Sequence, residues 1–161
     1  MQNPPPPPPP SSGPPPMMPP PGGGAIAAPA GNSASPGLRI VGGLIDFVIL
    51  LVVGGIIGLI FQKAQAVGGL IGLVIDIAYF GYFWSSRGAS IGMMPFGFKV
   101  RDMATGQYPT MGKAALRGFI WVVEASLTFC LVGAIGWLWM LWDPQKQALH
   151  DKVAGTIVTT S

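Results

Sequence analysis

Long uncharged, apolar runs alternate with short polar stretches through most of this chain. The first run predicts a helix at about 38–61, and the polar link that follows it carries Lys63. A second helix is predicted at about 66–84, and a third apolar segment at about 115–142. Because about 20 apolar residues, rising about 1.5 Å each, cross a hydrocarbon core of about 30 Å, the pattern indicates three main transmembrane segments.

This pattern predicts an all-α membrane protein. The link between the first two helices is short, so they should form an antiparallel hairpin, and several glycines lie where the two helices could approach closely. These glycines occupy positions 54, 55, 58, 68, 69 and 72. The third segment contains Gly133 and Gly136 and leaves two alternatives open. It is either one tilted span, or a broken or re-entrant pair that returns the tail to its starting side.

A polar stretch at 85–113 separates the second and third apolar segments. Within it, 96–103 predicts a short strand and 104–106 its turn, and the β-branched residues of 154–160 predict a second short strand. Asp102 is the only acid in the polar stretch. Its basic residues are Arg87, Lys99, Arg101 and Lys113. By the positive-inside rule this short β-like loop is cytoplasmic, which predicts a multi-pass protein of the cell membrane with a cytoplasmic N-terminus.

Composition supports a membrane class and separates an arm from a domain. Half of the residues are hydrophobic and only 9% are charged, which leaves too much apolar surface for a soluble domain of this size. Fifteen of the 18 prolines precede Gly37. We therefore expect 1–36 to be a disordered, proline-rich cytoplasmic arm and 37–161 to be one transmembrane domain. No basic run suggests a nucleic-acid partner, and no secretory signal pattern precedes the first helix.

Two apolar segments open in the same way, with an arginine followed seven residues later by an acid. These pairs are Arg39 with Asp46 and Arg117 with Glu124. In a helix each pair shares one face, about 10 Å apart along the axis. Asp76 adds a third acid, in the middle of the second predicted helix. A charge at that depth in hydrocarbon costs roughly 3 kcal/mol or more, so these acids must face protein, water or an ion.

Three interpretations of these charges remain open. Asp46, Asp76 and Glu124 could form proton-binding or cation-binding sites, because repulsion and burial raise a carboxyl pKa and hard cations prefer carboxylate oxygens. Alternatively, Arg39 and Arg117 pair with acids on neighbouring helices and lock the bundle. A third possibility is recognition of some other ligand.

No residue pattern supports an enzyme. His150 is the only histidine and Cys130 the only cysteine, so neither a metal centre nor a disulfide framework nor a catalytic triad is predicted. No cofactor is expected.

Three parts of the sequence, in this order, resemble the RDD family of small membrane proteins, which is named for one arginine and two aspartates. The opening from Arg39 to Asp46 is similar to the family's first helix. The segment 88–106 is similar to its glycine-threonine loop, strand and turn, and 147–156 is similar to its closing signature. The resemblance covers about 37–160, which is nearly everything but the arm.

The resemblance also implies roles and shows departures. It makes Asp151 the candidate for the second named aspartate. Ser90 stands where threonine is common, Met93 where a lysine usually follows the glycine, and Glu124 where many members have aspartate. Transport of ions or other ligands is suggested for some members of the family. A proline-rich arm before such a domain is similar to bacterial, and in particular actinobacterial, members.

These observations predict a protein of the lipid bilayer that transports, or supports transport of, a small cation or proton. Asp46, Asp76 and Glu124 would be the exchangeable sites, and Arg39 and Arg117 would hold them in place. Three spans are few for a pore, so a homo-oligomer is expected. The alternative is a non-catalytic membrane anchor or adaptor, which recruits or stabilises a partner protein through its proline-rich arm and basic loop.

Overall fold

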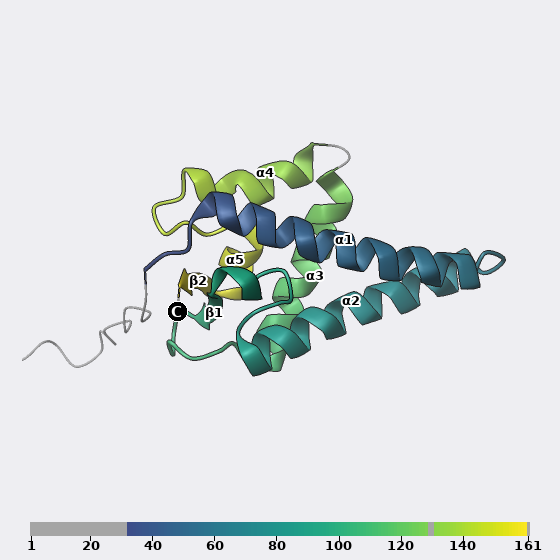
Figure 1. The fold of residues 1–161 in the computed structure, drawn as a ribbon, viewed down its shortest axis with the longest axis horizontal. Helices are drawn as coiled ribbons and strands as arrows, with labels where there is room; N and C mark the ends of the chain where they lie inside the picture. Colours follow the sequence, from purple (N-terminus) through teal and green to yellow (C-terminus); the bar gives the residue numbers. More distant parts are fainter. Residues whose placement is uncertain (1–31, 129–130, 161) are drawn as a thin grey trace, which may run out of the picture.

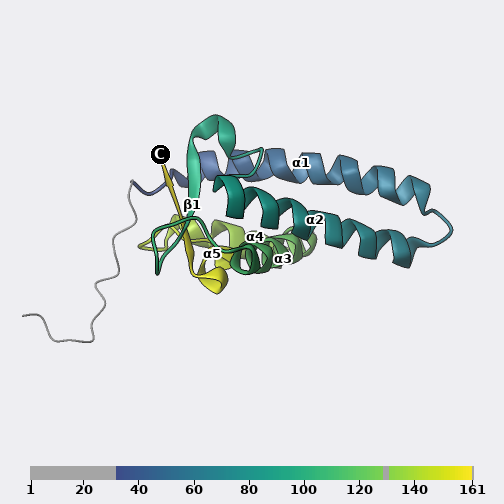
Figure 2. The same cartoon turned by 90° about the horizontal axis from the view of Figure 1, so that it is seen from below.

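The computed structural model describes residues 32–128 and 131–160, so most of the predicted arm and Cys130 lie outside the described residues. Helices α1 (Pro36–Ile60) and α2 (Gln65–Arg87) form an antiparallel hairpin that is the longest feature of the molecule (Figure 1). We call the link at 61–64 the tip and the opposite end of the hairpin the base. The other helices and both strands gather toward the base, and the hairpin projects beyond them (Figure 2).

Local sequence explains where the hairpin helices begin and end. Pro36 occupies the first turn of α1, where a missing backbone N–H does no harm. Gly88 caps the end of α2 in the left-handed conformation, with φ of 66°. Both helices are long and apolar enough to cross a membrane, and only 28% and 17% of their most apolar windows are buried. Such exposure is typical of helices that face lipid rather than of the core of a soluble protein.

The third apolar segment is not one helix. It consists of α3 (Met111–Leu127) and a short α4 (Val132–Leu138), followed by a 3-10 turn η3 (Trp139–Leu141). Leu131 has φ of 62°, which ends any continuous helix, and Gly133 lies so close to α3 that a Cβ there would be 1.9 Å from the Glu124 carbonyl oxygen. Of the two alternatives for the third apolar segment at about 115–142, the structure has the broken pair, and within the described residues two helices, not three, have the length and composition of a span.

The broken pair changes the course of the chain. In Figure 1, α3 runs across the two hairpin helices, and α4 then runs back beside α1 toward the base. The crossing of α2 and α3 depends on small residues, because a Cβ on Gly118 would lie 2.7 Å from that of Phe80, and one on Gly81 would lie 3.1 Å from the Met111 sulfur. The tail thus returns to the end of the hairpin from which α3 started.

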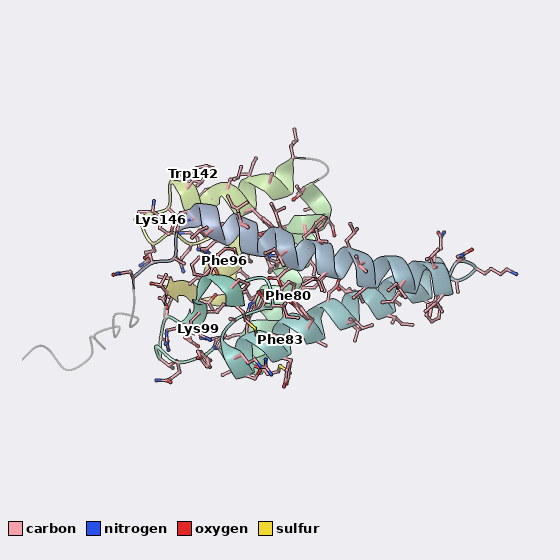
Figure 3. All side chains as sticks on the ribbon, viewed as in Figure 1. Phe80, Phe83, Phe96, Lys99, Trp142 and Lys146 are labelled. Atoms are coloured by element: carbon pink, nitrogen blue, oxygen red, sulfur yellow. The ribbon has the colours of Figure 1, made fainter. Side chains whose placement is uncertain are left out.

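A small sheet closes the base. The predicted strands are present as β1 (Phe98–Asp102), which follows the short 3-10 turn η1 (Met94–Phe96), and β2 (Thr156–Thr160). They pair antiparallel with each other, with Val100 opposite Val158, so the pairing joins segments that are far apart in the sequence. The short helix α5 (Leu149–Ala154) leads directly into β2. Aromatic side chains, including Phe80, pack the interior between these elements (Figure 3).

Candidate functional site

Asp151 on α5 is the centre of a buried ion cluster. Its Oδ1 accepts hydrogen bonds from Arg117 Nε and Nη2, at 2.9 and 2.6 Å, and its Oδ2 accepts one from Arg39 Nη2. The Ala148 amide also donates to Oδ2, at 3.1 Å. One carboxylate from the end of the chain therefore ties α1 to α3. Burial alone would raise the pKa of Asp151, but Arg117 and Arg39 together hold it well below its ordinary value.

The two arginines are further fixed by neighbours that are not acids. Arg39 Nη1 donates to the carbonyl oxygen of Lys146, in the loop before α5. The Arg117 guanidinium lies over the Trp84 ring, with its Cζ 4.0 Å from the ring centroid, a cation–π contact. Neither arginine makes a hydrogen bond to the acid seven residues further along its own helix, although each pair shares the buried face of its helix.

Asp46 is held by the loop that follows α2. Its Oδ1 accepts hydrogen bonds from the Tyr79 hydroxyl, at 2.7 Å, and from the Gly92 amide, at 2.8 Å, and its Oδ2 accepts one from the Ser90 hydroxyl. A Cβ at Gly92 would lie 2.1 Å from the Gly42 carbonyl oxygen, so the loop can approach α1 this closely only with glycine there. Ser90 supplies a hydroxyl donor at the position where the family commonly has threonine, so this departure preserves the chemistry.

Glu124 forms a second buried pair with the chain's single histidine. Its Oε2 lies 2.7 Å from Nδ1 of His150, and both side chains are nearly fully buried. Gly136 on α4 leaves room for this carboxylate, because a Cβ there would lie 2.9 Å from Glu124 Oε1. A small cavity of about 30 Å³ is lined by His150 together with Arg39, Asp46 and Arg117. The fold thus brings all but one of the predicted or family-implied charged residues into one polar core at the base, together with His150. These are Arg39, Asp46, Arg117, Glu124 and Asp151.

Asp76 stands apart from this polar core. Within 32–128 and 131–160 it makes no hydrogen bond or ion pair, and it is only partly buried. It lines two hollows of about 290 and 530 Å³ beside α1 and α3, both of which also include Gly54 and Ser126. The three predicted acids therefore do not converge. Asp46 and Glu124 have close protein partners, whereas the carboxylate of Asp76 is free to bind a proton, a cation or a partner group.

The glycines of the hairpin line this free region. Gly68 alone among the six is tightly packed, since a Cβ there would lie 2.8 Å from that of Phe61. At the other five, an added Cβ would have no atom within 4 Å beyond the backbone of its own helix. These are glycines 54, 55, 58, 69 and 72. The expectation that these glycines bring α1 and α2 into close contact is thus wrong for five of them, and they form an open face beside Asp76.

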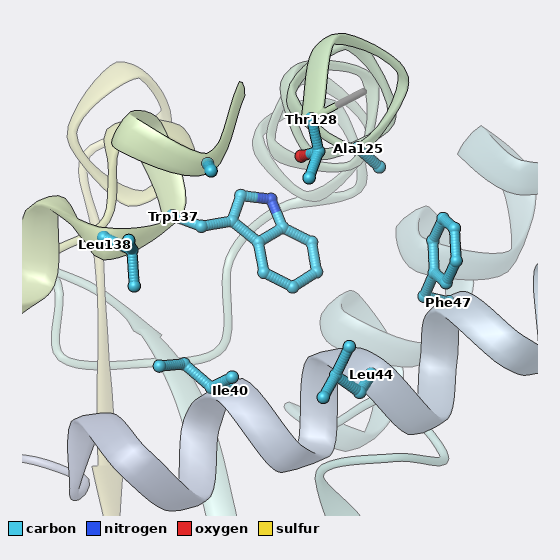
Figure 4. Close-up of a pocket in the computed structure, with 8 residues that line it drawn as sticks. Ile40, Leu44, Phe47, Ala125, Thr128, Trp137 and Leu138 are labelled. Carbon is cyan, nitrogen blue, oxygen red and sulfur yellow. The ribbon is translucent and has the colours of Figure 1, made fainter. Parts of the chain in front are cut away.

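A further apolar pocket of about 350 Å³ lies between α1 and the α3–α4 pair. Figure 4 shows Ile40, Leu44 and Phe47 of α1 facing Trp137 and Leu138 of α4 across it. Among the described residues that line this pocket none has an ionisable side chain. The Trp137 ring also lines the small polar cavity, and it separates the two.

Sequence reasoning did not identify three contributors to the polar core. Neither Tyr79 nor Ser90 is predicted from the sequence as a hydrogen-bond donor to Asp46, and His150 is not predicted as the partner of Glu124. The available signal was weak in each case, because a hydroxyl donor or a single histidine becomes informative only when an acid lies within hydrogen-bonding distance.

A sequence profile of the RDD family matches residues 33–155, so the chain belongs to the RDD family. The described fold fits that membership: it is mostly helical, with two helices of membrane-spanning length and a small two-stranded sheet. The resemblance makes Arg39, Asp46 and Asp151 the candidates for the family's named residues. In this structure the arginine contacts the second aspartate, and the first aspartate is bound by the loop instead.

Three relatives illustrate the range of similarity. An uncharacterized protein of Rickettsia prowazekii is 34% identical over 89 residues, covering 55% of this chain and 46% of the relative. The proline-rich antigen homolog of Mycobacterium tuberculosis is 33% identical over 101 residues, covering 63% of this chain and 39% of the relative. The proline-rich antigen of Mycobacterium leprae is 36% identical over 78 residues, covering 48% and 29%. The chain thus spans less than half the length of each relative, and no solved structure matches it.

Proposed function

We propose that this RDD domain binds and exchanges a proton or a small cation at Asp76 within the membrane, and so transports it or supports its transport. The observation that carries the proposal is the contrast between Asp76 and the other acids. Exchange requires a carboxylate that can change partners, and Asp76 has none among the described residues while it lines two hollows. A carboxylate at that depth needs a proton or a counter-charge, because an isolated charge in hydrocarbon is costly.

In this proposal the polar core has a different role from the one first assigned to Asp46 and Glu124. Hydrogen-bond partners hold both carboxylates in place. Asp46 accepts three hydrogen bonds, and binding an ion would require it to lose some of them. Asp46 would then act as a brace for the loop rather than as the exchanging group. Glu124 retains an unpartnered Oε1 among the described residues, so it stays a weaker candidate for proton binding.

Ion and pH flux in proteoliposomes tests the proposal. Wild type would be compared with Asp76→Asn and with the matched control Asp102→Asn, whose carboxylate at the base binds Lys113 instead. We expect Asp76→Asn to abolish flux while it still inserts and elutes as wild type does, and the control to retain flux. Equal flux in wild type and Asp76→Asn, or no flux from wild type under gradients of protons, Na⁺ and K⁺, would overturn it.

A homo-oligomer belongs to the same proposal. Two spans cannot enclose a pathway, and the open glycine face beside Asp76 would let helices of a second copy approach closely. Mass measurement of the protein in lipid nanodiscs gives the number of copies directly. A strictly monomeric protein with full flux would contradict this part.

The second candidate is the membrane adaptor, and one observation favours it. Ser33 forms a β-bridge with Thr159, so the chain that carries the proline-rich arm is attached to the sheet at the base. Residues 32–34 are thus held at the base, and this position supports presentation of a binding segment to a partner protein from there. Deletion of residues 1–31 leaves this bridge intact and separates the two functions. An adaptor would lose partner capture with the arm, whereas transport through Asp76 would persist.

A further inference from the structure

Three cations lie at the base near the end of α2: Lys99 and Arg101 beside the Tyr108 ring, and Arg87 over the Phe83 ring, with its Cζ 5.7 Å from the centroid. Lys99 Nζ lies 5.9 Å and Arg101 Cζ 5.6 Å from the centroid of the Tyr108 ring. Lys99 Nζ also donates to the carbonyl oxygen of Arg87, at 3.0 Å, which places it next to the last residue of α2. The ring itself is pressed against Gly88, where a Cβ would lie 2.4 Å from Tyr108 Cε1. We call Arg87, Lys99 and Arg101 the basic cluster.

No described acid neutralises the basic cluster. Asp102, the acid next to Arg101 in the chain, binds Lys113 at 2.7 Å, and its pKa is lowered because the hydrogen bond and charge of Lys113 outweigh its desolvation. The negative end of α2 offsets part of one charge at most. Like charges on neighbouring side chains repel one another, and a bound anion or the surrounding solvent relieves that repulsion.

Position identifies the kind of anion. The exposed apolar face of α2 ends near Tyr82, whose side chain is 53% exposed, five residues before Arg87. An aromatic side chain at the end of an apolar helix marks the level of the lipid headgroups. Lys99 and Arg101 are on β1, which lies beside that end of α2 (Figure 2). The basic cluster therefore lies where the phosphates of a bilayer leaflet would be.

We propose that the basic cluster is a binding site for the phosphate headgroup of an anionic phospholipid. Arg87 and Lys99 supply most of its donors: Lys99 Nζ uses one of its three N–H groups on the Arg87 carbonyl oxygen, and Arg101 Nη1 is bound to the Gly106 carbonyl oxygen at 3.0 Å. Juxtamembrane lysines and arginines are attracted to the anionic lipids of a leaflet. At the tip the single cation is Lys63, so the two ends of the hairpin differ in charge and the site orients the domain toward the anionic face. This inference does not rest on exchange at Asp76.

Lipid retention measured by native mass spectrometry tests the site. The full chain would be offered equimolar phosphatidylglycerol and phosphatidylcholine, as wild type, as the double variant Arg87→Gln/Lys99→Gln, and as the matched control Lys63→Gln. We expect wild type to retain phosphatidylglycerol several-fold over phosphatidylcholine, the double variant to retain the two lipids about equally, and the control to keep the preference of wild type. An unchanged preference in the double variant would overturn the proposal.

Two further arms cover the failure of the variant and the source of the phosphate. The charge-preserving pair Arg87→Lys/Lys99→Arg keeps the fold and the charge, and it should retain most of the preference; its loss would mean that packing, not charge, determines retention. Millimolar inorganic phosphate or an acidic peptide should not displace the lipid. Displacement by either would show that the basic cluster serves a soluble anion or a protein instead, which also overturns the proposal. Asp76→Asn should leave the lipid preference as in wild type, whatever its flux.

Discussion

An aspartate in the polar core at the base and an aspartate on the open face of the hairpin have opposite environments. Asp151 is completely buried, and two arginines and a backbone amide donate to it. Asp76 is partly exposed and binds no described residue. The difference lies in what covers the hairpin, since α3, α4 and α5 pack against its base half and leave the face beside Asp76 open.

We infer from this contrast that the base is the rigid region and that the open face is the region suited to exchange. At the base, one ion cluster holds together three helices that are far apart in sequence, α1, α3 and α5. Removal of any member of the cluster leaves a buried charge behind. Along the open face no described residue bonds to Asp76, so its substitution need not disturb the fold. The predictions below test whether the two regions differ as strongly in energy as they do in geometry.

The largest effect is expected for Asp151→Asn. The substitution keeps the shape but leaves two buried guanidinium groups without a counter-charge, which we expect to lower the free energy of unfolding by about 3–5 kcal/mol. Thermal unfolding in detergent, followed by tryptophan fluorescence, measures the change. The control Asp143→Asn removes the ion pair with the partly exposed Lys152, while its amide oxygen can still accept from the Gln145 and Gln147 amides, and it should cost about 1 kcal/mol or less. Equal losses in the two variants would contradict the central role of Asp151.

A pair of glycine substitutions compares the two regions directly. Gly92→Ala places a methyl group 2.1 Å from the Gly42 carbonyl oxygen and forces the loop away from Asp46, with an expected loss of about 1–3 kcal/mol. Gly55→Ala meets no atom within 4 Å, so the same unfolding measurement should change by about 0.5 kcal/mol or less. A destabilising Gly55→Ala would show that the open face is covered by a second copy or a partner.

Tyr79→Phe should have a moderate effect. It removes one of the three donors to Asp46 and also the acceptor for the Ile91 amide, at 3.1 Å, while the ring remains. A hydrogen bond to a charged group contributes about 1.5–3 kcal/mol, and the two remaining donors should limit the loss to the lower end. Limited proteolysis of the loop at 88–97 is the direct readout, because the loop should be cut faster. Tyr82→Phe, on the exposed face of α2, serves as the control.

The smallest effect is expected from mild acid. Because the pKa of Asp151 is lowered in the folded chain, its stabilisation is fully present above its ordinary pKa of about 3.9 and is lost only as the pH falls toward the folded value. The difference in stability between wild type and Asp151→Asn should thus be constant from about pH 8 to about pH 5 and shrink only below about pH 4. A difference that shrinks already between pH 7 and pH 5 would mean that the cluster is not ionised as described.

Much of the helical framework could be predicted from the sequence, whereas the arrangement of the polar core could not. The apolar runs placed α1 and α2 to within a few residues, because a helix that crosses hydrocarbon must satisfy its backbone hydrogen bonds internally and needs a fixed length. The seven-residue spacing placed Arg39 and Asp46 on one buried face for the same local reason. The strands at 98–102 and 156–160 also follow from local preferences.

By itself, then, the sequence determined the membrane character, the two long helices and the faces that carry charge, because each of these depends on residues close together in the chain. Only the tertiary structure decided which charges meet. Arg39 and Arg117 share Asp151 rather than the acids on their own helices, since the break at Leu131 turns α4 back and carries α5 to the base. The same turn leaves Asp76 uncovered. Partner choice among charges depends on contacts between distant segments, and no local pattern in the chain encodes those contacts.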